Sequence, residues 1–425
     1  MVGDKFQQYV CVNSCIARMY LYDRCHIITV EGLGSTVDMH PVQESFVNEH
    51  GAQCGYCTPG FICAMANMAN DLKLSGKPRT EQKVKNYLTG NLCRCTGYEP
   101  IINAGMKVNL NTTKPLSELY NDAKILSEFL SVGLGDVSIK SAEREIYLPL
   151  NLADACKYKT QHTDSRLISG GTDLGVVENK GKLSLSKILC LNNISNAYEI
   201  LETQTHFEIG AKVTLSQICH AIEKEFPEFA GILHIFASPQ IKNVGTLVGN
   251  LVNASPIADT TPFLMVNEAI IKLVSEKGRR EINVNDFFKG GYKELDLKEN
   301  ELVESIILPK SAHEYKLYKV SPRKDLDIST VTFAARYKIV DDEIQDINFA
   351  FGGVGPTVLR APKLENLARG RVLDNKLIQE LSTEVLKEVT PLSDHRGSSS
   401  YRNQLCSNLV IRFGDEIMAN TEANL

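Results

Sequence analysis

Four cysteines in two tight pairs are the residues of this chain best suited to chemistry. Cys54 and Cys57 form a C-x-x-C pair, and Cys93 and Cys95 form a C-x-C pair, with 35 residues between the two pairs. Four thiolates in this arrangement can hold a zinc ion or an iron–sulfur cluster. Zinc modules usually present both pairs as C-x₂₋₄-C on hairpin turns, whereas the second pair here has a single spacer. The spacing therefore favours a 2Fe–2S cluster and leaves zinc as the alternative.

Two glycine-containing turns indicate a second site. Ser169-Gly170-Gly171-Thr172 follows a predicted strand, and Val244 to Asn250 contains Gly245 and Gly249. Glycine lets backbone N–H groups approach a pyrophosphate closely. Neither turn is a dinucleotide fingerprint, because no G-x-G-x-x-G opens a helix after a strand. Ordinary turns remain the alternative to a dinucleotide site in which Asp259 contacts ribose hydroxyls. Tyr292 could stack on a ring or could simply be a loop tyrosine.

The elements that must position these residues follow from caps and periodicity. The pattern predicts a helix after His40-Pro41, a helix capped by Thr58 with Pro59 at its first position, a loop from Asp71 to Pro78, and helices at 81–88 and about 98–108. Two strands are expected within residues 8–32, and residues 111–143 read as a linker. Alternating signals follow, with strands near 164–169 and 207–210 and a helix at 215–226 after Thr214. Further strands are predicted at 331–337 and 346–351, with helices at 376–388 and 400–413.

Composition excludes several classes of function. The chain has 425 residues, a length that predicts two to four domains, and its composition of 43% hydrophobic and 23% charged residues is that of a globular protein. Its net charge of −5 gives no reason to expect nucleic acid or a membrane as partner. No basic stretch followed by an apolar run opens the sequence. The twelve cysteines are therefore expected in a reducing, cytoplasmic compartment, and no catalytic Ser/His/Asp arrangement is readable.

Four motifs resemble the amino-terminal part of the xanthine dehydrogenase/aldehyde oxidase family of molybdo-flavoenzymes. They are Val30-Glu31-Gly32-Leu33-Gly34, His40-Pro41-Val42-Gln43, Gln53 to Gly60, and Gly90 to Tyr98. The resemblance implies a 2Fe–2S cluster on Cys54, Cys57, Cys93 and Cys95, with Gln53 facing a molybdopterin in full-length members.

The same resemblance implies an FAD site in the second half of the chain. The implied FAD contacts are Leu167, Ile168, Ser169, Gly170, Gly171, Thr172, Asp173, Leu174, Phe236, Thr246, Leu247, Val248, Gly249, Asn250, Asp259, Val303 and Lys319.

The implied multidomain fold has an all-α 2Fe–2S-binding domain (36–110), an α/β FAD-binding domain of the vanillyl-alcohol-oxidase type (144–310) and an α+β flavoprotein C-terminal domain (311–425). Residues 1–35 would be a remnant of a plant-type ferredoxin domain, and 111–143 a linker. In that remnant Cys15 matches a fourth cluster ligand whose three partners are absent.

The molybdenum domain, with the molybdopterin, the substrate pocket and the catalytic residues, would follow Leu425, so the chain reads as a fragment with no catalytic residue of its own. Electrons would pass from molybdenum through the cluster to FAD.

Lys324-Asp325-Leu326-Asp327 stands where xanthine dehydrogenases have a more acidic run. An aldehyde oxidase using oxygen is therefore expected, with NAD use by a xanthine dehydrogenase as the alternative. A truncated, non-catalytic partner of full-length subunits is the other alternative, and full-length members are homodimers.

Overall fold

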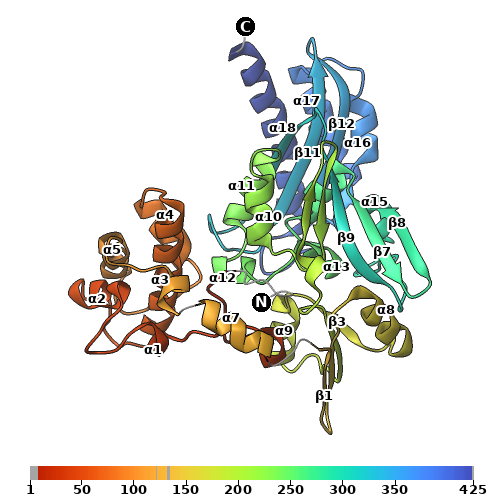
Figure 1. The fold of residues 1–425 in the computed structure, drawn as a ribbon. Helices are drawn as coiled ribbons and strands as arrows, with labels where there is room; N and C mark the ends of the chain where they lie inside the picture. The colour runs from red at the N-terminus through yellow and green to blue at the C-terminus, as the bar shows by residue number, and fades with distance from the viewer. Residues whose placement is uncertain (1–7, 121, 132–134, 424–425) are drawn as a thin grey trace.

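The computed structural model describes residues 8–120, 122–131 and 135–423. A helical lobe comes first along the chain, followed by a region built on two sheets, and then by a third sheet covered with helices. Figure 1 shows the helical lobe standing beside the two-sheet region, with the third sheet and its helices at the far end.

The helical lobe carries both cysteine pairs at helix ends. It contains α1 (Val30–Leu33), α2 (Pro41–Asn48), α3 (Thr58–Ser75), α4 (Glu81–Leu88) and α5 (Glu99–Lys107). Phe46, Phe61 and Met65 are among its fully buried side chains. Thr80 begins α4, because its hydroxyl accepts a hydrogen bond from the Lys83 N–H at 3.2 Å. The C-x-x-C pair lies where α3 begins, and the C-x-C pair follows the end of α4.

A mixed four-stranded sheet begins the next region. Its order is β1 (Val137–Lys140), β2 (Glu145–Leu148), β4 (Lys187–Cys190), β3 (Arg166–Ile168), and β4 runs parallel to both β2 and β3. Helices α8 (Leu152–Gln161) and α9 (Thr172–Asn179) connect these strands. Parallel strands joined through helices place the turn after β3 at one edge of the sheet, and α9 starts from that turn.

The second sheet of the region is antiparallel. It runs β5 (Ile200–Glu202), β6 (His206–Gly210), β9 (Leu302–Pro309), β7 (Ile270–Ser275), β8 (Gly278–Asn283). The helices between β6 and β9 are α10 (Leu215–Ile222), α11 (Pro227–Ile235), α12 (Pro239–Lys242), α13 (Leu247–Val252), α14 (Thr261–Asn267) and α15 (Val284–Phe287). Phe229 and Phe263 stack at 4.0 Å between ring centroids in the largest core of the chain.

The third sheet contains β10 (Glu314–Val320), β11 (Val331–Val340), β12 (Glu343–Gly352) and β13 (Leu359–Arg360) in sequence order. Helices α16 (Pro362–Ala368), α17 (Asn375–Glu384) and α18 (Ser399–Ala423) form a separate core with β11 and β12. Within the described ranges, no helix combines the length and the apolar character that a transmembrane span requires.

Residues 8–27 join the lobe to the two-sheet region. Tyr20 and Leu21, in a 3₁₀ helix (Met19–Tyr22), belong to the core under the mixed sheet. Arg18 pairs with Glu178 at 2.6 Å near the end of α9, and Arg144 pairs with the same carboxylate at 2.8 Å. These contacts fix the amino-terminal segment onto α9.

Several sequence predictions are wrong in detail. The described part of residues 8–32 contains no strand, because its apolar side chains enter cores formed by other elements. Helix α3 continues to Ser75 through the expected loop and ends at Gly76 with φ 63°. Cys57, not Thr58, is its N-cap residue. The expected linker 111–143 holds α6 (Leu116–Leu119), α7 (Asp122–Ser131) and β1, with residue 121 and residues 132–134 outside the described part.

The helix expected at 215–226 ends at Ile222, and α11 starts again at Pro227. The helix expected at 81–88 is present with those bounds as α4. The other expected helices and strands are present with shifted ends: the strands expected at 331–337 and 346–351 are longer, and α18 continues to Ala423.

Replacing Thr214 with alanine should destabilise the protein by about 1 kcal/mol. Thr214 and Gln217 form a capping box at the start of α10, and the Thr214 hydroxyl accepts from the Gln217 N–H at 3.3 Å. Urea unfolding of wild type and T214A measures the change in free energy of unfolding. The control is Thr383→Ala, because this exposed hydroxyl bonds only a carbonyl of its own helix. Equal stability of wild type and T214A would show that the cap contributes nothing.

Candidate functional site

The structure brings the four paired cysteines together. Cys54 Sγ lies 3.5 Å from Cys95 Sγ, and Cys95 Sγ lies 3.8 Å from Cys93 Sγ. Cys57 lies close enough to Cys93 for the two thiols to influence each other's ionisation. The thiols therefore form a continuous group contributed by the start of α3 and by the loop after α4, as their spacing predicted.

The thiols of this group differ in their acidity. The Thr96 hydroxyl, 3.0 Å from Cys93 Sγ, stabilises the thiolate and lowers the pKa of Cys93 to about 6. A backbone hydrogen bond from Tyr56 lowers the pKa of Cys54. Burial and the neighbouring Cys93 raise the pKa of Cys57 to about 11. Thiolates are the form that binds metal, so the site already favours that form at two of its positions.

The surroundings of the four thiols contain donors without partners. Two buried polar atoms at this edge, Thr58 Oγ1 and Asn91 Nδ2, have no hydrogen-bond partner. Such donors suit the sulfur acceptors of an iron–sulfur cluster. The donor set and these orphaned groups therefore fit a 2Fe–2S cluster.

Cys15 does not join this group. It is exposed in the amino-terminal segment, and its carbonyl accepts from Asn179 Nδ2 at 2.9 Å on α9. No hydrogen bond among the described residues involves its thiol.

The first glycine turn is pressed against the second. A side chain at Gly170 would place its Cβ 2.2 Å from the Val244 carbonyl oxygen. The Thr246 hydroxyl donates to the Ser169 hydroxyl at 3.3 Å, which in turn donates to the Ala211 carbonyl at 2.9 Å. The two turns therefore form one backbone surface. A cradle that excludes even a methyl group is a fitting place for the backbone to receive a diphosphate.

The remaining residues expected at the flavin are distributed around this surface. Leu167 and Ile168 end β3, and Thr172, Asp173 and Leu174 open α9. Thr246 begins α13, where its hydroxyl accepts from the Gly249 N–H at 3.0 Å. The side chains of Leu247 and Val248 are buried in the main core, as is Val303 on β9. Asn250 accepts a hydrogen bond from the Thr260 hydroxyl at 2.6 Å.

Asp259 and Lys319 form a buried ion pair that the sequence did not predict as a pair. Lys319 Nζ lies 2.5 Å from Asp259 Oδ2, and the side chains are 1% and 5% exposed. Ser329 completes a triangle, donating to Asp259 Oδ1 at 2.5 Å and accepting from Lys319 at 2.8 Å. Charged side chains buried this deeply need a partner of opposite charge. The triangle connects the segment just before α14 with β10 and with the segment just before β11.

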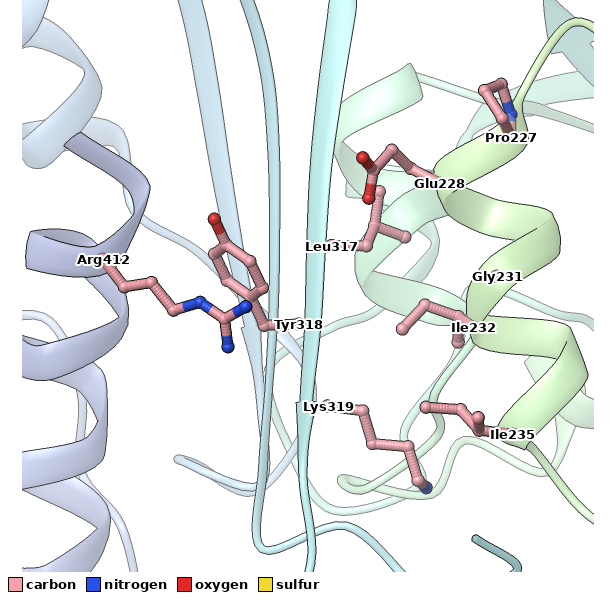
Figure 2. Close-up of a pocket in the computed structure, with 9 residues that line it drawn as sticks. All are labelled: Pro227, Glu228, Gly231, Ile232, Ile235, Leu317, Tyr318, Lys319 and Arg412. Atoms are coloured by element: carbon pink, nitrogen blue, oxygen red, sulfur yellow. The ribbon is translucent and has the colours of Figure 1, made fainter. Parts of the chain in front are cut away.

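A cavity of about 400 Å³ opens beside Lys319. Figure 2 shows it between α11 and β10, with Lys319 and Ile235 at one end and Glu228 at the other, while Arg412 approaches Tyr318 from α18. Its volume is that of a small-molecule pocket. Phe236 directly follows Ile235, so the cavity adjoins two of the expected flavin contacts. Tyr292 is 67% exposed.

Sequence reasoning missed Ser329, Thr96 and Lys212. Lys212 is buried, and its ammonium donates to the Ser169 carbonyl at 2.8 Å. A single charged residue inside the apolar run Ile209 to Leu215 was the available signal. Ser329 and Thr96 gave no such signal, because hydroxyl residues are ordinary in loops.

The helical lobe contacts α12, which directly precedes the second flavin turn. A methyl group at Gly90 would lie 1.9 Å from Gln240 Oε1, so Gly90 and the α12 side chain are in tight contact. Asn243, just after α12, donates to the Cys11 carbonyl at 2.9 Å, and the Cys11 N–H donates to Asn67 on α3 at 2.7 Å. The segment after Gly90 leads to Cys93, and the segment after Asn243 leads to Thr246.

Comparison with sequence models of known families finds three matches in tandem. Residues 29–106 match the [2Fe-2S] binding domain, residues 140–311 the FAD binding domain in molybdopterin dehydrogenase, and residues 316–417 the CO dehydrogenase flavoprotein C-terminal domain. The expected three-domain layout and the expected cofactors, a 2Fe–2S cluster and FAD, are confirmed.

Curated relatives of the chain include xanthine dehydrogenases. The chain is 30% identical to xanthine dehydrogenase of Oryza sativa subsp. japonica, 28% to xanthine dehydrogenase 1 of Arabidopsis thaliana and 28% to xanthine dehydrogenase/oxidase of Rattus norvegicus. These matches cover 96%, 96% and 95% of this chain but 35%, 35% and 34% of the relatives. The chain therefore spans about a third of their length.

Solved structures share the fold. Quinoline 2-oxidoreductase of Pseudomonas putida 86 matches with a TM-score of 0.60 at 24% identity, over 64% of this chain and 96% of that one. Carbon monoxide dehydrogenase of Hydrogenophaga pseudoflava matches with a TM-score of 0.61 at 23% identity, over 64% and 96%. With its three domains in this order, the chain belongs to the molybdo-flavoenzyme family that includes xanthine dehydrogenase, and it carries the 2Fe–2S-binding and FAD-binding portion.

Proposed function

We propose that this chain is the electron-transfer portion of a molybdenum hydroxylase that oxidises aldehydes or N-heterocycles. The contact of Gly90 with Gln240 carries the proposal, because it joins the loop of the C-x-C pair to the helix between Phe236 and Thr246. When bound, the cluster and FAD supply one-electron and two-electron chemistry, respectively. The protein's task is to hold both within reach of each other.

Particular residues would perform that task. Cys54, Cys57, Cys93 and Cys95 hold the cluster, and the Thr96 hydroxyl stabilises the Cys93 thiolate. Tyr56 and Leu92 are 94% and 80% exposed beside these thiols, which leaves this edge open to an electron donor such as a molybdenum domain. The turns at Ser169–Thr172 and Thr246–Asn250 receive the FAD diphosphate, while Phe236 and Lys319 border the isoalloxazine. The domain limits 36–110, 144–310 and 311–425 are part of this proposal.

For the electron acceptor we propose oxygen, as in an aldehyde oxidase. The loop after β10 holds Arg323, Lys324, Asp325 and Asp327, so its cations balance its carboxylates. Arg323 Nε lies 3.1 Å from Asp327 Oδ2, which neutralises that carboxylate further. NAD is the second candidate, because the curated relatives named above are xanthine dehydrogenases. A cytoplasmic, homodimeric holoenzyme is part of the same proposal.

Cys93→Ser should remove the iron and the labile sulfide from the purified chain, because serine cannot replace this thiolate with equal affinity. Metal and sulfide analysis of C93S and wild type gives the result. The matched control is Cys63→Ser, a half-buried cysteine of α3 outside the group of four, which should keep both. One zinc per chain without labile sulfide in the wild type would contradict the cluster.

Gly170→Ala should lower the FAD content of the purified chain at least about tenfold, since its Cβ would overlap the Val244 carbonyl and separate the two turns. Bound flavin is measured by absorbance after denaturation, alongside the melting temperature. Gly135→Ala is the control, because no atom lies within 4 Å of a Cβ at that position. Full FAD content in a folded G170A would show that these turns do not receive the cofactor.

Anaerobically reduced chain should be reoxidised by oxygen and not measurably by NAD. Stopped-flow absorbance of the flavin after mixing with each acceptor measures both rates. Lys324→Asp, which shifts the loop toward an acidic run, should leave the oxygen rate within about twofold because the residue lies on the surface. Faster reoxidation of the wild type by NAD than by oxygen would favour the xanthine dehydrogenase alternative.

A further inference from the structure

Lys212 is a buried cation for which the described residues provide no carboxylate partner. It lies just after β6, is 5% exposed, and takes part in none of the ion pairs formed by the described residues. Its ammonium donates to the Ser169 carbonyl at 2.8 Å and to Asn192 Oδ1 at 2.7 Å. These two neutral acceptors take two of its three hydrogens but do not balance its charge, and an unpaired buried charge is costly.

The groups that face Lys212 from neighbouring elements do not supply the missing negative charge near neutral pH. They are Cys190 on β4, Cys25 on the amino-terminal segment and Tyr198, whose ring centroid is 5.5 Å from the ammonium. Burial raises the pKa of each of these three groups above its ordinary value. Asp23 is also close to these cysteines, but it pairs with Arg24 at 3.5 Å and accepts from Asn193.

The position of Lys212 in the fold indicates which anion it would bind. Ser169 is the residue immediately before Gly170 and Gly171, and its carbonyl is held by Lys212 while its hydroxyl is held by Ala211 and Thr246. Lys212 thus orients the turn that the proposed function assigns to the FAD diphosphate. Its partner Asn192 also donates to the Leu21 carbonyl at 2.6 Å, which links the same cation to the amino-terminal segment.

We propose that Lys212 is a positioning residue for FAD: it orients the Ser169–Thr172 turn and provides the buried positive charge that the diphosphate neutralises. This inference rests on the proposed function of that turn. A diphosphate close to a buried cation stabilises the charged form of the lysine, so binding and protonation of Lys212 favour one another.

The coupling between FAD binding and the protonation of Lys212 has a defined direction. Burial lowers the pKa of Lys212 to about 8 in the flavin-free chain, and a neighbouring diphosphate raises it again. At a pH between the pKa of Lys212 in the free chain and its pKa in the complex, the complex holds more protons than the free chain. FAD affinity is therefore constant below about pH 8 and falls as pH rises above it, by up to about tenfold per pH unit for a single group.

The test is titration of FAD into the flavin-free full chain by calorimetry from pH 6.5 to 9.0, in two buffers of different ionisation enthalpy. Wild type should lose affinity above about pH 8 and take up a proton there. Lys212→Arg should bind with an affinity independent of pH, since guanidinium does not titrate in this range. Lys212→Met should bind at least about tenfold more weakly at pH 7 and without pH dependence.

Two further measurements separate the explanations. Cys25→Ser should keep the wild-type pH profile, which excludes titration of that thiol as its cause. The melting temperature of each flavin-free variant reports any purely structural loss. The inference is wrong if K212M and K212R lose stability and FAD affinity alike and both keep the pH profile of the wild type. It is also wrong if K212M binds FAD as tightly as the wild type does. A wild-type chain that binds no FAD at all would contradict the proposed function and this inference with it.

Discussion

The contact between Gly90 and Gln240 is the constraint on which the rest of the structure depends. Gly90 lies just after α4 and three residues before Cys93, and Gln240 lies in the short helix between Phe236 and Thr246. With no side chain at residue 90, the loop of the C-x-C pair can rest directly on α12. Cys11 reinforces the contact through backbone hydrogen bonds to Asn67 and Asn243 on its two sides. Electron transfer needs a fixed separation between its centres, and these contacts provide one.

The charged and ionisable groups differ between the cysteine site and the flavin site. The thiol group is exposed on one edge, where hydroxyl and backbone donors stabilise thiolates. The flavin side is buried, and its cations are Lys319, paired with Asp259, and Lys212, paired with no carboxylate among the described residues. A low-dielectric surrounding strengthens the attraction of such a cation for an anionic cofactor. The cost of burying Lys212 is thus understandable as a contribution to cofactor binding.

Spacing and caps were sufficient to predict much of this arrangement. Four cysteines in two pairs predicted a tetrathiolate group, and Thr80 and Thr214 marked the helices that position it and the flavin turns. These signals are local, so they can be read from the chain directly. Family resemblance supplied the order of the domains and the identity of the cofactors, which neither composition nor periodicity could have separated from a zinc site and ordinary turns.

The failures share a physical cause, which is contact between residues distant in sequence. Residues 8–16 and 25–32 looked like strands, but their apolar side chains, such as Tyr9 and Ile28, pack on the core of the helical lobe instead of pairing with a strand. Ser329 reaches Asp259 across 70 residues, and Lys212 reaches Ser169 across 43. No local pattern records such pairings. The linker expected at 111–143 contains α7, whose amphipathic pattern was masked by its polar surroundings.

An anaerobic reductive titration of the chain, followed by absorbance and electron paramagnetic resonance, tests the central claim most directly. The account predicts about three electrons per chain, one taken up by a single 2Fe–2S cluster and two by FAD, with both centres reduced in the same molecules. Uptake of about two electrons without an iron–sulfur signal, or about one without flavin bleaching, would contradict the account, because the two sites would then not form one electron-transfer unit.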